Sequence, residues 1–207
     1  TAGWGKTIFA ASWLAAAAPD RVLAWVNLDE ADDDPHAFWC AVATALMPDL
    51  KGPAVEALQR VTAGAVEADD LPRLLATALD LVPAPTALVL DNLHEIRSPS
   101  VHSGLVRLVE RPPPSLALLV TTRRDPPWPL AQLRLAGLVA EVRAVDLAFR
   151  AEEAAELFCR LGVGVTAPQL ERLVERTEGW PAGLRLAAMH LKGVADTMAL
   201  YRVVGTP

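Results

Sequence analysis

The chain has 207 residues, of which 52% are hydrophobic and 21% charged, and its formal net charge is −6. Apolar and charged residues interleave along it, which is typical of a folded globular chain and excludes a disordered one. The negative charge argues against a surface that wraps DNA or RNA, because such surfaces gather Lys and Arg. Cys40 and Cys159 fit no metal-ligand or disulfide pattern, so we expect both to be buried thiols.

The first seven residues, TAGWGKT, have the form of the end of a phosphate-binding P-loop. Gly3 and Gly5 let the backbone approach a phosphate closely, and the positive end of the following helix favours the anion. We expect Lys6 to reach the β- and γ-phosphates and the hydroxyl of Thr7 to bind Mg²⁺. A glycine-rich turn before an ordinary surface helix is the alternative. The predicted nucleotide contacts are Gly3, Trp4, Gly5, Lys6, Thr7 and Ile8.

A helix is predicted to follow the loop over Ile8–Ala17. The longest apolar run of the chain, Ile8–Ala18, is too short to span a bilayer, so we expect a cytoplasmic protein with no membrane partner. The continuous apolar run Val22–Leu28 predicts a strand that is buried on both faces, as in a parallel sheet. After it, an acidic turn caps a helix predicted over His36–Leu46, and one or two further helices fill Val55–Leu81.

Two more buried strands are predicted, over Ala87–Leu90 and Leu116–Val120, and each is followed by polar residues. Ligands of open α/β sheets bind outside the carboxyl ends of the strands, so these polar residues mark the expected site. A helix over Ser100–Glu110 provides the crossover that parallel pairing requires. Leu138–Val145 is predicted as a fourth, more exposed strand.

From Arg150 onward the pattern is helical only, with helices predicted over Ala151–Leu161, Ala167–Thr177 and Pro181–Leu191. The predicted fold is therefore α/β, with the parallel sheet of a P-loop NTPase followed by a small helical subdomain. We place the α/β core at residues 1–149 and the helical subdomain at 150–207. A P-loop is normally reached from a strand, so we also expect the chain to be a fragment whose first strand is missing.

Asp91 ends the buried run Thr86–Asp91, which has the form of a Walker B strand. Hard cations prefer carboxylate oxygens, so Asp91 is predicted to hold Mg²⁺. The alternative is an aspartate that only caps the next turn. Asn92 follows where many hydrolysing relatives carry a second acid, and an amide cannot act as a general base, so we expect slow hydrolysis. His94 and Glu95 are the other candidates for orienting water, although an ordinary loop role suits both better.

Arg123 follows the third strand and is predicted to point toward the γ-phosphate, because a planar and permanently charged guanidinium suits that contact. It would then report the state of the nucleotide. The alternative is a surface ion pair of Arg123 or Arg124 with Asp125.

Similarity to a known family rests on five strings in chain order, namely AGWGKT, WVNLDEADDDPHAFW, LVLDNLHEI, LLVTTRRDPPWPLAQLR and TEGWPAGLRLAA. In these five strings, the chain resembles the large, MalT-like transcriptional regulators of the LuxR type. The ATP-binding core of that family belongs to the STAND class of P-loop NTPases. The resemblance covers nearly the whole chain. It implies an ATP-binding core with a helical subdomain here, and a winged-helix domain, a helical-repeat sensor and a DNA-binding helix-turn-helix beyond this chain.

The resemblance also implies roles for single residues. Gly3, Gly5, Lys6 and Thr7 would bind phosphates and Mg²⁺, Asp91 would be the Walker B acid, and Arg123 the sensor arginine. Gly179-Trp180-Pro181 looks like the GxP motif of the family, in which the proline packs on the adenine. Two features depart from the family pattern: Asn92 stands where relatives often have Asp, and the strand before the P-loop is missing. In the family sheet, that strand lies between the strands predicted at Leu116–Val120 and Leu138–Val142.

The leading interpretation is a regulatory switch. ATP with Mg²⁺ is expected to bind between the core and the helical subdomain, so that the γ-phosphate biases the two against each other and weak ATPase activity resets them. Self-association on activation is expected, and DNA would be bound only through the C-terminal domain outside this chain. The alternatives are an AAA-type ATPase module whose turnover drives remodelling, and a degenerate scaffold domain that binds no nucleotide.

Overall fold

The computed structural model describes residues 2–17, 21–64, 66–67, 70–82 and 84–204. These residues form two compact units. The larger unit is Thr7–Ala140, and the smaller unit combines Thr1–Lys6 with Glu141–Pro207. The domain boundary expected at residue 150 stays a prediction.

The larger unit contains a parallel sheet of three strands, β1 (Val22–Asn27), β2 (Thr86–Asp91) and β3 (Leu116–Val120), in the order β1-β2-β3. In the register of the sheet, Asn27 lies beside Asp91. This confirms the predicted α/β class, and the three strands lie within a few residues of their expected bounds. Only β2 is buried along its whole length. The expected burial is wrong for the two outer strands of the described sheet, because β1 alternates between buried and exposed side chains, with Leu23 47% exposed, and β3 is half-buried. Because all strands run the same way, their carboxyl ends meet at one edge, where Asn27, Asp91 and the residues after β3 lie.

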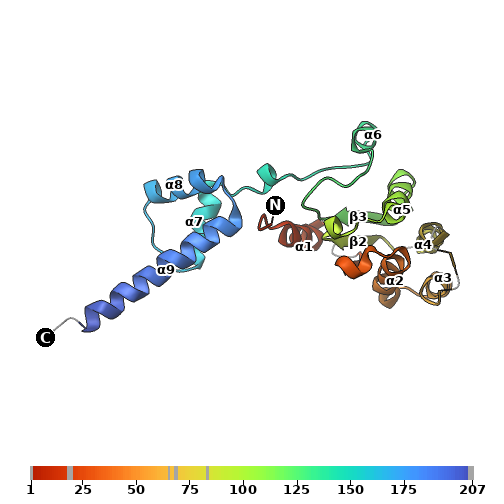
Figure 1. Ribbon diagram of the computed structural model, residues 1–207, viewed down its shortest axis with the longest axis horizontal. Coiled ribbons are helices and arrows are strands. Elements are labelled where there is room, and N and C mark those ends of the chain that lie inside the picture. Colours follow the sequence, from red (N-terminus) through yellow and green to blue (C-terminus); the bar gives the residue numbers. More distant parts are fainter. Residues whose placement is uncertain (1, 18–20, 65, 68–69, 83, 205–207) are drawn as a thin grey trace. The chain divides into compact units, whose positions relative to one another are not determined.

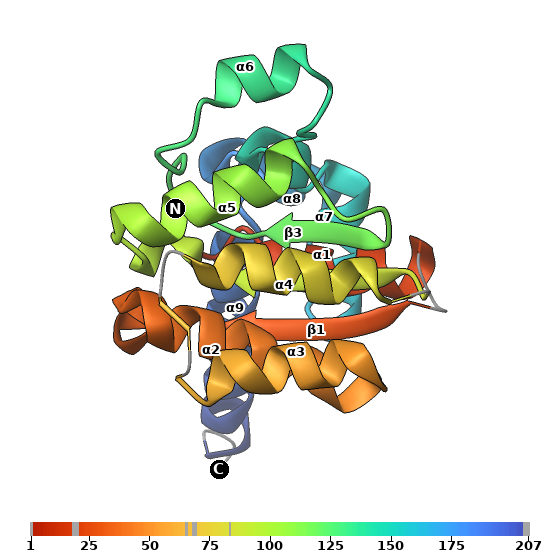
Figure 2. The same ribbon diagram turned by 90° about the vertical axis from the view of Figure 1, so that its right-hand side faces the viewer.

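Helices cover both faces of this sheet (Figures 1 and 2). One face is covered by α2 (Pro35–Leu46), α3 (Pro53–Thr62), α4 (Leu71–Asp80) and α5 (Pro99–Glu110), and the other by α1 (Lys6–Ala17). A short helix, α6 (Leu130–Leu135), follows β3. The acidic turn caps α2 as predicted, since the side chain of Asp34 accepts a hydrogen bond of 2.9 Å from the N–H of Ala37.

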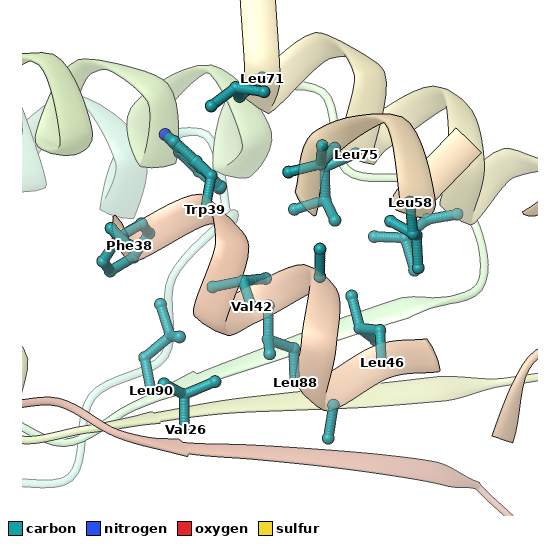
Figure 3. Close-up of a cluster of buried hydrophobic side chains, with 14 of the residues drawn as sticks. Val26, Phe38, Trp39, Val42, Leu46, Leu58, Leu71, Leu75, Leu88 and Leu90 are labelled. Atoms are coloured by element: carbon teal, nitrogen blue, oxygen red, sulfur yellow. The ribbon is translucent and has the colours of Figure 1, made fainter. Parts of the chain in front are cut away.

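The side chains of β2 alternate between two apolar clusters, as a strand covered on both faces requires. Leu88 and Leu90 face the large cluster under α2, where Phe38 and Trp39 are fully buried (Figure 3). Ala87 and Val89 face a smaller cluster under α1 that is completed by Leu14. This two-sided packing fixes the end of β2, and with it Asp91, at the edge of the sheet.

The strand predicted at Leu138–Val145 is wrong. Residues 138–143 are irregular, and Ala144–Leu147 form a single 3-10 turn. A strand needs a hydrogen-bonding partner, and in the described chain β3 pairs only with β2. The apolar side chains of Leu138, Val142 and Val145 are exposed, so no packing against the described residues holds this segment in an extended form.

The smaller unit packs α7 (Ala151–Arg160), α8 (Ala167–Thr177) and α9 (Pro181–Val204) around a core of Ala154, Phe158, Leu170, Leu184 and Ala188. All three predicted helices are confirmed, and the last is longer than predicted. Cys159 on α7 is exposed, and Cys40 on α2 is only half-buried, so the expectation of two buried thiols is wrong. No helix among the described residues has the length and apolar character that crossing a membrane requires.

Candidate functional site

The glycines of the predicted phosphate loop have a backbone conformation that favours glycine. Gly3 has φ +78° and Gly5 has φ +75°, a left-handed region that other residues rarely adopt. Lys6 is the first residue of α1, so the loop leads directly into the amino end of a helix. The side chains of Trp4 and Lys6 are half-buried, whereas Ile8 is 72% exposed.

Thr7 and Asp91 lie together although they are 84 residues apart in the chain. The hydroxyl of Thr7 donates to the carboxylate of Asp91, with Oγ1 at 3.2 Å from Oδ1 and 3.0 Å from Oδ2. Asp91 is only 4% exposed. The structure thus brings together the two residues that the sequence predicts as magnesium ligands, and both belong to the larger unit.

Thr121, the first residue after β3, is a third member of this cluster. Its buried hydroxyl donates to Oδ1 of Asp91 and accepts a hydrogen bond of 3.1 Å from the backbone N–H of Asn92. These bonds fix the rotation of the Asp91 carboxylate. The sequence placed Thr121 at the carboxyl edge of the sheet but assigned it no role. Its position could have indicated this role, because Thr121 is the first polar residue after β3, the strand that pairs with β2.

Asn92 turns toward β1. It has φ +65°, a left-handed conformation that Asn tolerates better than most residues, and its Nδ2 donates to Oδ1 of Asn27 at 2.9 Å. Asn27, at the end of β1, was not predicted as a site residue. The carboxyl edge of the sheet therefore presents, in strand order, the amide of Asn27, the carboxylate of Asp91 and the hydroxyl of Thr121.

This donor set fits Mg²⁺. The cation prefers hard oxygen ligands and is commonly held by one or two protein groups together with phosphate oxygens and water. The hydroxyl of Thr7 and the carboxylate of Asp91 are oxygens of that kind within hydrogen-bonding distance of each other. Two hydroxyl groups donate hydrogen bonds to the Asp91 carboxylate and hold its oxygens in place.

The other predicted residues of the larger unit lie on loops. Arg123 is exposed on the loop after β3, and no described residue forms a hydrogen bond or ion pair with its side chain. Arg124 instead donates from Nη2 to the carbonyl of His94 at 2.9 Å. His94 and Glu95 are neighbours whose Nε2 and Oε1 lie 3.2 Å apart. The roles proposed for these side chains stay predictions.

The smaller unit brings the GWP motif against the first residues of the loop. Nε1 of Trp180 donates to the carbonyl of Ala2 at 3.1 Å, and the N–H of Ala182 donates to the carbonyl of Gly3 at 3.2 Å. Pro181 is half-buried as the first residue of α9, a position that suits its fixed φ and its missing N–H. The sequence associated this motif with the nucleotide but did not predict its contact with the loop.

Curated proteins resemble the chain over nearly all of its length. It is 32% identical over 192 residues to the HTH-type transcriptional regulator MalT of Cronobacter sakazakii. The aligned region covers 91% of this chain and 21% of that protein. It is 30% identical over 202 residues to the protein of the same name from Vibrio cholerae, covering 96% of this chain and 22% of that protein. This chain is homologous to the MalT regulators.

The MalT-like chain spans about a fifth of the length of the curated relatives that it matches. A relative from Yersinia enterocolitica, 32% identical over 202 residues, has the same name. No family model matches the chain. The similarity therefore concerns one segment of these regulators.

Proposed function

We propose that this MalT-like chain binds ATP with Mg²⁺ and serves as the nucleotide-dependent switch of a transcriptional regulator. The observation that carries the proposal is the pairing of Thr7 with Asp91, because a hydroxyl that follows a glycine-rich loop and a carboxylate at a strand end form the magnesium site of P-loop NTPases. The relatives are named as transcriptional regulators, which supports the regulatory part.

In this proposal the loop from Gly3 to Thr7 holds the phosphates through its backbone N–H groups and through Lys6. Thr7 and Asp91 hold the magnesium ion, which neutralises charge on the phosphate oxygens when it is bound. Thr121 keeps the Asp91 carboxylate in one orientation. Arg123 contacts the γ-phosphate.

Regulation suits this edge of the sheet better than rapid turnover does. Asn92 occupies the position after the Walker B carboxylate, and its amide has no basic lone pair with which to activate water. The Asn92 side chain is also engaged by Asn27. Hydrolysis is therefore weak and resets the switch. In the whole regulator, activation brings self-association, and DNA is bound through a separate helix-turn-helix domain.

The test is thermal stabilisation by nucleotide in the regulator at its natural length. A ligand at one hundred times its dissociation constant stabilises the folded state by about 2.7 kcal/mol. For a domain of this size that corresponds to a rise in Tm of roughly 5–10 °C. We expect this rise with ATP and Mg²⁺ in the wild type and its loss in Lys6→Ala.

The matched control is Lys51→Ala, which removes the same charge from an exposed position before α3 and should keep the full rise. A wild type whose Tm does not respond to ATP and Mg²⁺ would refute the proposal and leave the scaffold interpretation.

A further inference from the structure

Two successive carbonyls of the phosphate loop are bonded to the start of α9, within the smaller unit. The indole N–H of Trp180 donates to Ala2 O at 3.1 Å, across 178 positions of the chain. The backbone N–H of Ala182, in the first turn of α9, donates to Gly3 O at 3.2 Å. The first N–H groups of a helix have no partner within the helix, which explains the bond from Ala182. The bond from the Trp180 side chain is a second link between the start of α9 and the loop.

Two glycines leave the space that the indole of Trp180 occupies. A Cβ on Gly3 would lie 2.9 Å from Nε1 of Trp180 and 2.6 Å from the Cβ of Ala182. A Cβ on Gly183 would lie 2.6 Å from Cε3 of the same indole. Distances this short do not occur between real side chains, so Trp180 keeps this position only because both residues are glycine. Gly3 is in the phosphate loop and Gly183 is in α9.

The bonds to the carbonyls also set the direction of the loop N–H groups. In a planar trans peptide, the C=O of one residue and the N–H of the next point in opposite directions. Holding the carbonyls of Ala2 and Gly3 toward α9 therefore directs the N–H groups of Gly3 and Trp4 away from α9. N–H groups of this loop are the ones that a phosphate would accept.

We propose that Trp180 is a positioning residue for the phosphate loop, because its N–H holds the Ala2 carbonyl and thereby presents the loop N–H groups to a phosphate. The inference rests on the proposed function, since it presumes that the loop binds ATP. A loop that is already ordered loses less conformational entropy when ligand binds, so this bond raises nucleotide affinity without touching the nucleotide.

Trp180→Phe tests the bond, because it removes the N–H and keeps an aromatic ring in the same place. The affinity for ATP with Mg²⁺ is measured in the regulator at its natural length, by displacement of a fluorescent ADP analogue. A net hydrogen bond of ordinary strength corresponds to a dissociation constant that is about three to ten times higher. We expect a change of this size.

Trp128→Phe is the matched control. Trp128 is also half-buried, and its Nε1 donates to Nδ1 of His102 at 3.2 Å in the larger unit, so the same atom and the same kind of bond are lost. Both substitutions should lower stability to a similar degree. Only Trp180→Phe should change the dissociation constant of ATP, which separates positioning of the loop from a general loss of stability.

Gly183→Ala provides a test that does not depend on the stability of Trp180→Phe. Alanine favours the helix more than glycine does, which offsets part of the cost of displacing the indole with the new Cβ. We expect weaker ATP binding, because the displaced indole no longer holds the Ala2 carbonyl although its N–H is still present. If the wild type binds ATP and both variants bind it equally well, the role of Trp180 is refuted. If the wild type does not bind ATP, the proposed function itself fails.

Discussion

At the scale of single residues, the polar cluster of Thr7, Asp91 and Thr121 depends on the Asp91 carboxylate. Its carboxylate is almost fully buried and accepts hydrogen bonds from the hydroxyls of Thr7 and Thr121. A buried charge is tolerated when hydrogen bonds compensate for the lost water, and hydroxyl donors achieve this without adding a second charge. The negative charge of the cluster therefore remains available to a cation.

Asp91→Asn keeps the shape of the side chain and removes its charge. We expect the thermal stabilisation by ATP to lose most of its dependence on Mg²⁺, because an amide is a poor ligand for a hard cation. The free energy of unfolding should fall by about 1–3 kcal/mol, since charge-assisted hydrogen bonds become neutral ones. Thermal shifts with ATP are compared in Mg²⁺ and in EDTA.

The control is Asp80→Asn, which changes an exposed carboxylate at the end of α4 and should leave both shifts unaltered. An equal Mg²⁺ dependence in Asp91→Asn and the wild type would remove Asp91 from the metal site.

The two cysteines should differ in reactivity, because the thiolate is the reactive form. The pKa of Cys40 is raised by burial and by the nearby charge of Asp34, and its Sγ lies 3.6 Å from the carbonyl of Val61, to which it donates. Cys159 is exposed on α7. At pH 8, iodoacetamide should therefore label Cys159 well before Cys40, as mass spectrometry of peptides would reveal. Faster labelling of Cys40 would contradict this environment.

At the scale of elements, the sequence predicts what local chemistry decides. The apolar run at β2 predicts a strand covered on both faces, and the acidic turn predicts the start of α2 because acidic side chains favour the amino end of a helix. Leu138–Val145 has a similar apolar content, yet it forms no strand because no described strand pairs with it. Pairing is a property of the sheet, and a segment's own residues do not reveal it.

Gly104 illustrates packing that a helix pattern does not reveal. A Cβ at this position of α5 would lie 2.7 Å from Cζ2 of Trp39 and 2.7 Å from Cγ of Pro72. We expect Gly104→Ala to destabilise the fold by about 1–3 kcal/mol, because overpacking outweighs the gain in helix propensity. A Cβ at Gly193, in α9, would meet no atom of the described residues within 4 Å, so Gly193→Ala should instead stabilise the fold by about 0.5–1 kcal/mol. Urea unfolding of both variants measures the difference, and a stabilising Gly104→Ala would show that the core can relax.

At the scale of the whole molecule, the candidate site could be predicted only in part. Thr7 and Asp91 were expected to meet, because a phosphate loop and the carboxyl end of a parallel strand converge at one edge of the sheet. Asn27 and Thr121 carry no signal beyond being polar at strand ends. The bond between Trp180 and Ala2 joins positions 178 residues apart, and no local pattern in the sequence reports a contact between a side chain and such a distant carbonyl.

The rate of hydrolysis distinguishes a switch from a motor. A switch must hold its triphosphate state long enough for a response, whereas an enzyme whose turnover is its function usually reaches about one event per second or more. With an amide at Asn92 beside Asp91, we expect single-turnover hydrolysis of ATP by the regulator at its natural length to be slower than about one per second.

Asn92→Asp extends this test, because it places a proton acceptor where the wild type has an amide, in a left-handed conformation that aspartate also tolerates. Hydrolysis should become faster than in the wild type, since a positioned general base lowers the barrier to attack by water. ATP affinity is measured in parallel, so that a change in binding is not mistaken for a change in the chemical step. Sustained wild-type turnover at about one per second or above would favour the remodelling ATPase, because a triphosphate state that short-lived leaves little time for a transcriptional response.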